Sequence, residues 1–473
     1  MSELLQPAPQ SPRRRPPEEG APTAFVTRTI VSRDAPLVDA LDFLRSAQGP
    51  RFYAYLPAAD MEVAGIGRAW TIEAQGPARF QQVKQAIAHL RKTVAVSGPL
   101  SASSLRLWGG FSFHDEETSP TWRGFAGACW FLPAFQYIRI GKEAFYVHAR
   151  NDDPGTATTK VRTGPLIVPE TRSAGSWTAT DEPQESWPRI ADQALQDIAS
   201  GAVQKLVLSR CRIFDHDAGN TGQEKPGMPQ LLAALRKQHT AGAIFAMESE
   251  RDRWFISATP ETLLSVRARR FETHALAGTR GAGAQEADAS IRQQLLHSKK
   301  DEREHAWVVE GITHALTPLS DSMTRRLTPE VFTIGALHHL STPITGQLRP
   351  GVHILDAVEK LHPTAAVGGF PRRPAQAWLR KNETDDRGWY ASPVGWVDFH
   401  GDGDLFVAIR SGLFTPKRAR IFAGAGLVEG SEPHREWQET ELKMRPLLEA
   451  MGLEGNGEGS KPPFSPGPEK AEV

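Results

Sequence analysis

Short runs of β-branched and aromatic residues recur along most of this chain, and in many of them apolar and polar positions alternate. Such runs are typical of strands with one buried face. The clearest examples are RFYAYLP, VAGIGRAWTIEA, AFQYIRIG, EAFYVHAR, KLVLSRCRIF, AIFAMES, RWFISA, LLSVRARRFETHAL, GWVDFHGDG, LFVAIRSGLF and RARIFAGAG.

A second set of stretches repeats its apolar residues every three to four positions, which predicts helices. The predicted strands do not alternate regularly with these helices. The pattern therefore favours an α+β fold with large antiparallel sheets over a doubly wound parallel sheet. The predicted helices cover residues 80–94, 186–200, 229–239, 286–299, 300–316, 353–359, 372–380 and 435–451.

Neither end of the chain has such periodicity. Residues 1–23 are rich in proline and contain an arginine triplet, and residues 455–473 are rich in Gly, Pro, Ser, Glu and Lys. Segments of this composition cannot bury enough apolar surface to offset the entropy of ordering. We predict disordered ends around a folded region, residues 24–454. A weak domain boundary is expected in the polar stretch 151–188, unless the sheets of the two halves interleave.

Composition narrows the class of function. The 473 residues are 40% hydrophobic, which is enough for a substantial core, and the formal net charge is zero. No global field then favours nucleic acid or an anionic membrane, and a small-molecule substrate fits better. The two cysteines, Cys129 and Cys211, indicate a reducing compartment. Without a long apolar run or an interface stripe, we expect a cytoplasmic monomer.

The segment IFAGAGLVEGSEPHREWQETELK brings candidate ligands together. If its second half is helical, Glu436, Glu439 and Lys443 project from one face. Two carboxylates on one face suit a hard divalent cation such as Mg²⁺, and Gly424 and Gly426 let backbone N–H groups approach an anion. The same spacing also occurs on solvated helix surfaces, so this segment alone leaves both interpretations open.

Five further motifs follow one another along the chain. They are VQKLVLSR with Lys205, FISATPETLL with Glu261, SKKDEREHAWVV with Glu304, RGWYASPVGW with Tyr390 and LFVAIRSGLF with Arg410. In this order the sequence resembles the chorismate-utilising enzymes, and the isochorismate synthases most of all. The resemblance is strong over residues 190–450 and weaker back to about residue 50. It implies two large antiparallel sheets packed together, with helices outside and a site between the sheets.

Two residues are candidates for proton transfer. Lys205 begins an apolar run that can desolvate its ammonium and lower its pKa, although a lysine at a strand start is also common as a solvated flank. The resemblance implies that Lys205 activates water, because members that use ammonia typically carry glutamine there. It also implies that Glu261 is the general acid for the leaving 4-hydroxyl group. Glu261 must then hold its proton near neutral pH, which requires apolar surroundings or a nearby negative charge.

The run HALAGTRGAG combines small residues and glycines, as expected where backbone lies against a ligand, or in a simple turn. We expect Ala275, Gly278 and Thr279 to line the substrate site. Related aminodeoxychorismate synthases carry a nucleophilic lysine at the position of Ala275, so that amine chemistry is not expected here. His274 departs from many relatives, which carry glutamate.

The resemblance assigns the remaining ligands. Mg²⁺ would be bound by Glu304, Glu436 and Glu439, with one of the last two acting through water. Arg410 offers the bidentate fork that suits a carboxylate. The other expected substrate contacts are Tyr390, Lys443, the backbone at Gly424 and, ranked below these, His339.

The expected activity is Mg²⁺-dependent isomerisation of chorismate to isochorismate, with Lys205 as base and Glu261 as acid, serving menaquinone synthesis. A salicylate synthase, a siderophore-pathway isochorismate synthase and a non-catalytic ligand-binding relative are the alternatives. The strings HPTAAVGGFP and ALAGT favour an enzyme that stops at isochorismate, and the intact acid, base and carboxylates argue against a non-catalytic relative.

Overall fold

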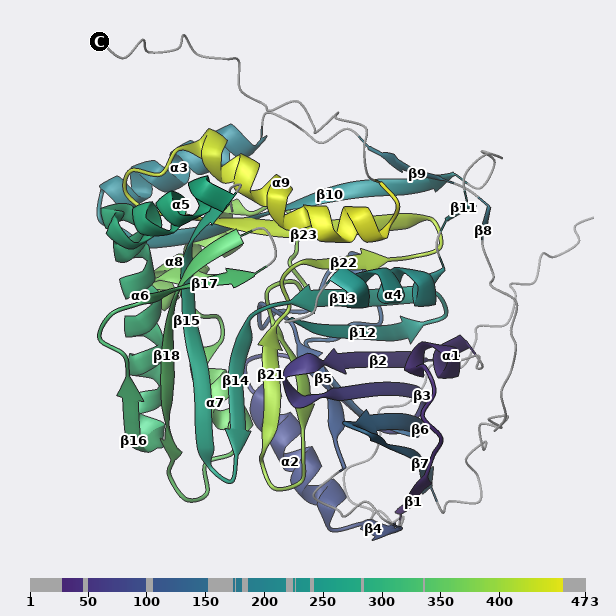
Figure 1. The fold of residues 1–473 in the computed structure, drawn as a ribbon. Coiled ribbons are helices and arrows are strands. Elements are labelled where there is room, and N and C mark those ends of the chain that lie inside the picture. The colour runs from purple at the N-terminus through teal and green to yellow at the C-terminus, as the bar shows by residue number, and fades with distance from the viewer. Residues whose placement is uncertain are drawn as a thin grey trace, which may run out of the picture.

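Strands and helices combine in an α+β fold, as predicted (Figure 1). The predicted disordered ends lie outside the part of the chain that the structure describes, and so does most of the stretch 151–188. No helix in the described part is long and apolar enough to cross a membrane. The computed structural model describes residues 28–45, 50–98, 105–151, 173–174, 176–180, 186–217, 224–225, 227–238, 242–281, 285–334 and 337–453.

The strands of the first sheet lie across Figure 1 and follow one another downward, from β10 at the top to β7 near the bottom. All neighbouring strands in it are antiparallel except β1 and β4. Its strands, in spatial order, are β9 (Ser176–Ala179), β10 (Lys205–Asp217), β23 (Arg418–Leu427), β22 (Ser411–Phe414), β13 (Arg253–Thr259), β12 (Ala243–Glu250), β2 (Arg51–Leu56), β3 (Met61–Ala74), β6 (Ala128–Ile140), β7 (Glu143–Asn151), β1 (Arg28–Asp34) and β4 (Val94–Ser97).

The second sheet runs down the left of Figure 1, and its described pairs are all antiparallel. It begins with the other ends of β3 and β6. Its further strands, in spatial order, are β5 (Leu107–Phe111), β20 (Pro393–Val397), β21 (Gly403–Val407), β14 (Thr262–Arg267), β15 (Arg270–Gly281) and β18 (Leu337–Leu348), which pairs with both β16 (Ser320–Arg325) and β17 (Glu330–Ile334).

The two sheets are continuous through β3 and β6. The register between these strands shifts between Arg68 and Trp70, directly after Gly67, whose φ is 67°. A bulge of this kind bends both strands and increases their twist. One half of β3 therefore pairs within the first sheet and the other half within the second, and the apolar faces enclose one large core.

The N-terminal strands are inserted among later ones. β2 lies between β3 and β12, and β5 lies between β6 and β20. Each sheet thus combines strands from distant parts of the sequence, as the interleaved alternative of the sequence analysis allowed.

The predicted helices are all present, and Figure 1 shows them on the outside of the sheets. One short helix, α1, was not predicted. The helices are α1 (Ala40–Arg45), α2 (Arg79–Arg91), α3 (Ser186–Ala199), α4 (Met228–Gln238), α5 (Gln285–His297), α6 (Lys299–Leu316), α7 (Ile354–Leu361), α8 (Arg372–Asn382) and α9 (Pro433–Ala450). α6 and α9 matter most for function, because they carry the candidate metal ligands.

Two of the predicted strands are in fact pairs of strands. LLSVRARRFETHAL turns at Ala268 and Arg269, whose φ values of 48° and 70° end β14 and begin β15. LFVAIRSGLF is divided at Arg410, whose φ is 49°, into β21 and β22. Left-handed backbone at non-glycine residues is not visible in a hydrophobicity pattern.

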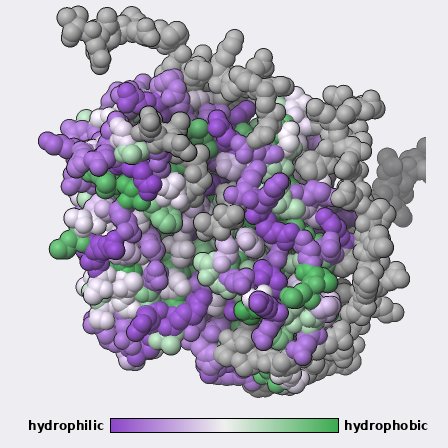
Figure 2. All heavy atoms as spheres, in the orientation of Figure 1, coloured by the Kyte–Doolittle hydropathy of each residue, from purple (hydrophilic) through white to green (hydrophobic). Residues whose placement is uncertain are grey.

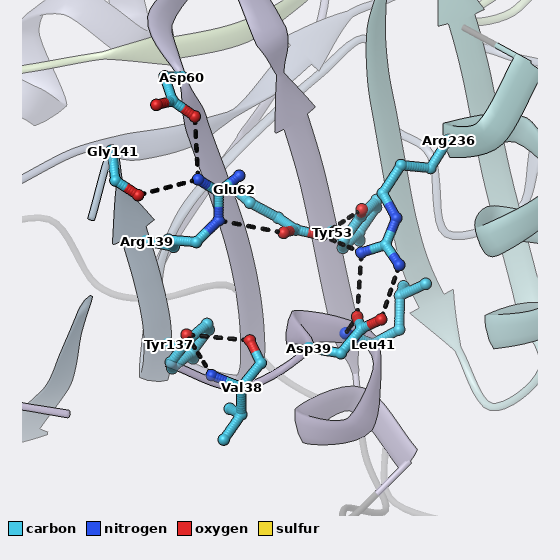
Figure 3. Close-up of polar contacts among 10 residues, drawn as sticks. All are labelled: Val38, Asp39, Leu41, Tyr53, Asp60, Glu62, Tyr137, Arg139, Gly141 and Arg236. Atoms are coloured by element: carbon cyan, nitrogen blue, oxygen red, sulfur yellow. Dashed lines mark hydrogen bonds and ion pairs between the residues drawn. The ribbon is translucent and has the colours of Figure 1, made fainter. Parts of the chain in front are cut away.

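A buried carboxylate joins the N-terminal strands to a helix in the middle of the chain (Figure 3). Glu62 on β3 is 5% exposed and accepts hydrogen bonds from the Tyr53 hydroxyl and from Arg236 on α4, both at 2.6 Å. Arg236 also forms a bidentate pair with Asp39, at 3.0 and 2.6 Å. Breaking such a network would leave a charge buried without its partner, which is strongly destabilising. The network therefore holds α4 against β2 and β3.

The face seen in Figure 2 is mostly hydrophilic, and its hydrophobic residues are scattered in small groups. Scattered apolar residues are normal on a soluble surface and mark no interface by themselves.

Candidate active site

One pocket lies where the two sheets and the helices α6 and α9 meet, and it encloses about 770 Å³, its open mouth included. β10 and β23 form one side, and β15 and β18 form the other. Most of the residues predicted for the site line this pocket. These are Lys205, Glu261, Gly278, Thr279, Glu304, His339, Tyr390, Arg410, Gly424, Glu439 and Lys443.

Lys205 begins β10 and is 1% exposed. Its Nζ lies 3.0 Å from Oε1 of Glu304 on α6, so its neighbours are not only apolar. A Cβ added at Gly426 on β23 would lie 2.7 Å from the same Glu304 oxygen and 3.2 Å from Cε of Lys205. The glycine therefore makes room for the ion pair.

Glu261 lies between β13 and β14 and is 8% exposed. Burial raises its pKa from 4.5 to about 7, although Lys205 and Lys443 oppose the shift. Such a carboxyl group still holds a proton near neutral pH, as a general acid requires. The pKa meets the condition that the sequence analysis set, whereas the catalytic role of Glu261 remains a prediction.

We expect Glu261→Gln to stabilise the protein at alkaline pH. The pKa of Glu261 is higher in the folded protein than in the unfolded chain, so the folded protein binds this proton more tightly. The stability that the bound proton contributes is therefore lost as the pH rises from 4.5 through 7. Glutamine does not ionise. The free energy of unfolding at pH 8.5 should exceed that of the wild type by about 3 kcal/mol, with little difference below pH 5.

The exposed Glu143 provides the control for this measurement. Glu143→Gln should leave the difference near zero at both pH values. Urea titrations monitored by fluorescence would give both free energies, and a pH-independent difference for Glu261→Gln would rule out the buried proton.

Arg410 is a buried cation that lacks a counterion among the described residues. It is 8% exposed, and burial alone lowers its pKa to about 10. Its left-handed φ of 49° is strained for a non-glycine residue. Such strain is found most often at functional sites, so it favours a role for Arg410 in ligand binding. A guanidinium desolvated in this way is suited to an anionic ligand, and a carboxylate would fit its fork.

Tyr390, Gly424 and Lys443 meet at the wall formed by β23. A Cβ at Gly424 would lie 2.7 Å from the Tyr390 hydroxyl, so only glycine lets the ring approach this strand. Lys443 on α9 donates to the carbonyl of Gly424 at 2.9 Å and lies 2.6 Å from Glu439. The ammonium thus connects α9 to the strand.

A bulge in β15 lies in the pocket wall opposite β23. The register with β18 shifts between Ala277 and Thr279, and Gly278 has a φ of 72°. The Thr279 hydroxyl lies 3.1 Å from Nδ1 of His339, whose pKa is lowered to about 3 by burial and by Lys443 and Arg410. This imidazole is therefore neutral and suited to hydrogen bonding.

The expectation for Ala275 needs correction. Its side chain is fully buried in the core and does not line the pocket, whereas Leu276 and Ala277 do. His274 also lies outside the pocket, where its Nε2 is 3.1 Å from Glu272. The departure at His274 thus leaves the pocket wall unchanged.

The predicted metal ligands do not converge in this structure. Among the residues it describes, no group of three or more His, Cys, Asp or Glu side chains is arranged to hold a metal ion. Each carboxylate instead contacts a lysine, and for Glu436, which lies outside the pocket lining, this is Lys300 at 2.7 Å.

The chemistry of these ligands nevertheless fits a hard cation. Glu436 is 3% exposed, and burial together with Glu439 and Glu304 raises its pKa to about 7 despite Lys300. The three carboxylates are thus close enough to repel one another in a desolvated region. Carboxylate oxygens are the donors that Mg²⁺ prefers. Binding would require them to exchange their lysine contacts for the ion.

Sequence patterns missed the apolar wall and the partners of the charged groups. Val207 and Val367 line the pocket, and Lys300 and Arg387 pair with acids near it. The only available signal was position, since Val207 follows Lys205 closely and Lys300 precedes Glu304 in the same motif.

Comparison with known proteins identifies the family. Residues 21–452 match the family described as chorismate binding enzyme. The chain belongs to the chorismate binding enzymes. The salicylate biosynthesis isochorismate synthase of Pseudomonas aeruginosa is 36% identical over 404 residues, which cover 82% of either chain. Isochorismate synthase MenF of Bacillus subtilis is 32% identical over 445 residues, 89% of this chain and 93% of the relative.

Solved structures of chorismate binding enzymes share the fold. The menaquinone-specific isochorismate synthase MenF from Escherichia coli matches 89% of this chain and 95% of its own, with a TM-score of 0.73 and 24% identity. Anthranilate synthase component I from Streptococcus pneumoniae gives a TM-score of 0.65 at 20% identity. These likenesses support the fold alone, and the second shows that the fold carries more than one reaction.

Proposed function

We propose that this chorismate binding enzyme is an isochorismate synthase, which converts chorismate to isochorismate. The observation that carries the proposal is the presence in one pocket of a buried lysine, Lys205, and a carboxyl group that keeps its proton near neutral pH, Glu261. Exchange of a hydroxyl group between two ring carbons needs one base and one acid. The names of the two relatives from Pseudomonas aeruginosa and Bacillus subtilis agree with this activity.

The reaction follows from these two groups. Lys205, as the base, takes a proton from water as the oxygen attacks C2 of the ring. The double bonds shift, the C4–oxygen bond breaks, and Glu261 donates its proton so that the leaving group departs as water. The atoms balance, because one water molecule enters and one leaves. The same groups can run the reaction backward, so the product should approach an equilibrium mixture.

The other residues of the pocket bind and orient the substrate. Arg410 is suited to one substrate carboxylate, and Tyr390 and the neutral His339 offer hydrogen bonds. Glu304, Glu436 and Glu439 would hold Mg²⁺, which when bound supplies positive charge to a substrate carboxylate. The apolar residues Val207 and Val367 form part of the pocket wall.

Incubation with chorismate and Mg²⁺ should yield isochorismate as the main early product, identified by chromatography and mass spectrometry. Ammonium should not divert the reaction, because Lys205 occupies the position that glutamine takes in ammonia-using relatives. Salicylate with pyruvate as the main early product would favour a salicylate synthase. Anthranilate formed from added ammonium would show that the role assigned to Lys205 is wrong.

We also propose that the product serves menaquinone synthesis in a monomeric, cytoplasmic enzyme. MenF of B. subtilis matches almost the whole chain, whereas the vibriobactin-specific isochorismate synthase of Vibrio cholerae covers 58% of it. The salicylate-pathway relative also matches over most of its length, so salicylate supply is the second candidate. Rescue of a menaquinone auxotroph that lacks isochorismate synthase would test the first pathway.

A further inference from the structure

A buried ion pair lies directly behind the pocket wall. Arg387 and Glu383 have side chains only 1% and 6% exposed, and they form a bidentate contact with distances of 2.7 and 2.6 Å. Removing two charges from water is expensive unless their remaining hydrogen-bonding groups are also satisfied. The other contacts of the pair therefore indicate what it holds in place.

Those contacts are main-chain groups of the pocket wall. Arg387 donates to the carbonyl of Val367 at 2.8 Å and to that of Val207 at 2.6 Å. Glu383 accepts from the backbone N–H of Ser209 at 2.9 Å. Val207 and Val367 both line the pocket, and Val207 is two residues from Lys205.

Strand β10 needs these partners because one of its edges is incomplete. Along one side it pairs with β23 from Leu206 to Asp215. Along the other side it pairs with β19 (Gly369–Phe370) only at its start and with β9 only at its end, and no other described strand lies between them. Arg387 and Glu383 satisfy the carbonyl of Val207 and the N–H of Ser209 in this gap. The ion pair thus replaces a missing stretch of strand.

The same arginine also supports Tyr390. Its guanidinium lies 4.3 Å from the ring centroid of Phe113 and 6.0 Å from that of Tyr390. The backbone N–H of Tyr390 donates to the carbonyl of Arg387 at 2.8 Å. One residue therefore contacts three parts of the wall, namely the strand of Lys205, the segment of Val367, and Tyr390.

We propose that Arg387 and Glu383 are positioning residues, which hold Lys205 in register with the opposite wall for the attack of water on the ring. The inference rests on the proposed function. Neither residue lines the pocket, so both act through the backbone. A displacement of about 1 Å at reacting groups can cost a hundred-fold in rate, and the expected effect is therefore on kcat.

Arg387→Lys tests this role, because lysine keeps the charge but lacks the planar fork that reaches Glu383 and two carbonyls. We expect kcat to fall by roughly 10- to 100-fold while KM changes less than about threefold. Arg51→Lys is the matched control. Arg51 forms a bidentate pair with Glu248 at 2.8 and 2.9 Å and stacks on Trp254, away from the pocket. The Arg51→Lys variant should have a lower melting temperature but an unchanged kcat.

Both variants should be assayed well below their melting temperatures. An unchanged kcat for Arg387→Lys, with only a lower melting temperature as in Arg51→Lys, would overturn the positioning role. If Arg387→Lys does not fold, Glu383→Gln decides, because its amide oxygen can still accept from Ser209 while the ion pair is lost. It should also lower kcat, and normal turnover would reject the role. Wild-type turnover in the same assay tests the proposed function separately.

Discussion

Lys205→Ala and Glu261→Ala are each expected to lower kcat by about a hundred- to ten-thousand-fold, the range for a lost general base or acid. Lys205 is buried against Glu304, and the buried Glu261 keeps its proton near neutral pH. Neither variant removes Arg410, so substrate binding should largely survive. Steady-state kinetics with chorismate, with KM and kcat determined separately, would show this difference.

The surface lysine Lys142 provides a control for the loss of an ammonium group. Lys142→Ala should keep full activity. If either Lys205→Ala or Glu261→Ala retains a kcat near that of the wild type, that residue takes no part in proton transfer. Circular dichroism of each variant would separate lost chemistry from lost folding.

Removal of divalent cations is expected to abolish turnover, and added Mg²⁺ should restore it. Glu439→Gln should cost more activity than Glu436→Gln, because Glu439 lines the pocket whereas Glu436 is not among the lining residues and contacts Lys300. For Glu436→Gln we expect a loss of about 10- to 100-fold in apparent Mg²⁺ affinity, the range for a supporting contact. Full activity after exhaustive chelation would contradict a metal requirement.

The Mg²⁺ dependence of activity should be measured for both variants at saturating chorismate. A weaker ligand set appears as a higher Mg²⁺ concentration at half-maximal rate, whereas a folding defect lowers the maximum rate at every concentration. Equal losses in the two variants would remove the distinction between Glu436 and Glu439.

Local sequence was sufficient for the elements, whereas most site residues were assigned through the resemblance to a family. Helices such as α6 and α9 follow from apolar periodicity, and Lys205 and Arg410 stand in distinctive strings. Ala275 shows where this reasoning ends. Successive residues of a strand face opposite sides, and the bulge at Gly278 decides which of them reach the pocket, so a motif cannot assign the face alone.

The partners of charged groups were harder to predict, because they come from distant parts of the chain. Lys300 contacts Glu436 136 residues away, and Arg387 reaches Val207 180 residues away. The need for Arg387 arises from the gap beside β10, which is a property of the assembled sheet. No pattern near Arg387 in the sequence contains that information.

The insertion of early strands among late ones has a consequence for synthesis on the ribosome. β5, at Leu107–Phe111, stays without its partner β20 until residues 393–397 have been made, and β2 must wait for β12. Strands with unpaired edges, which are prone to aggregate, are therefore exposed while translation continues. The nascent chain should depend on chaperones, and fragments cut between the two halves should aggregate rather than fold.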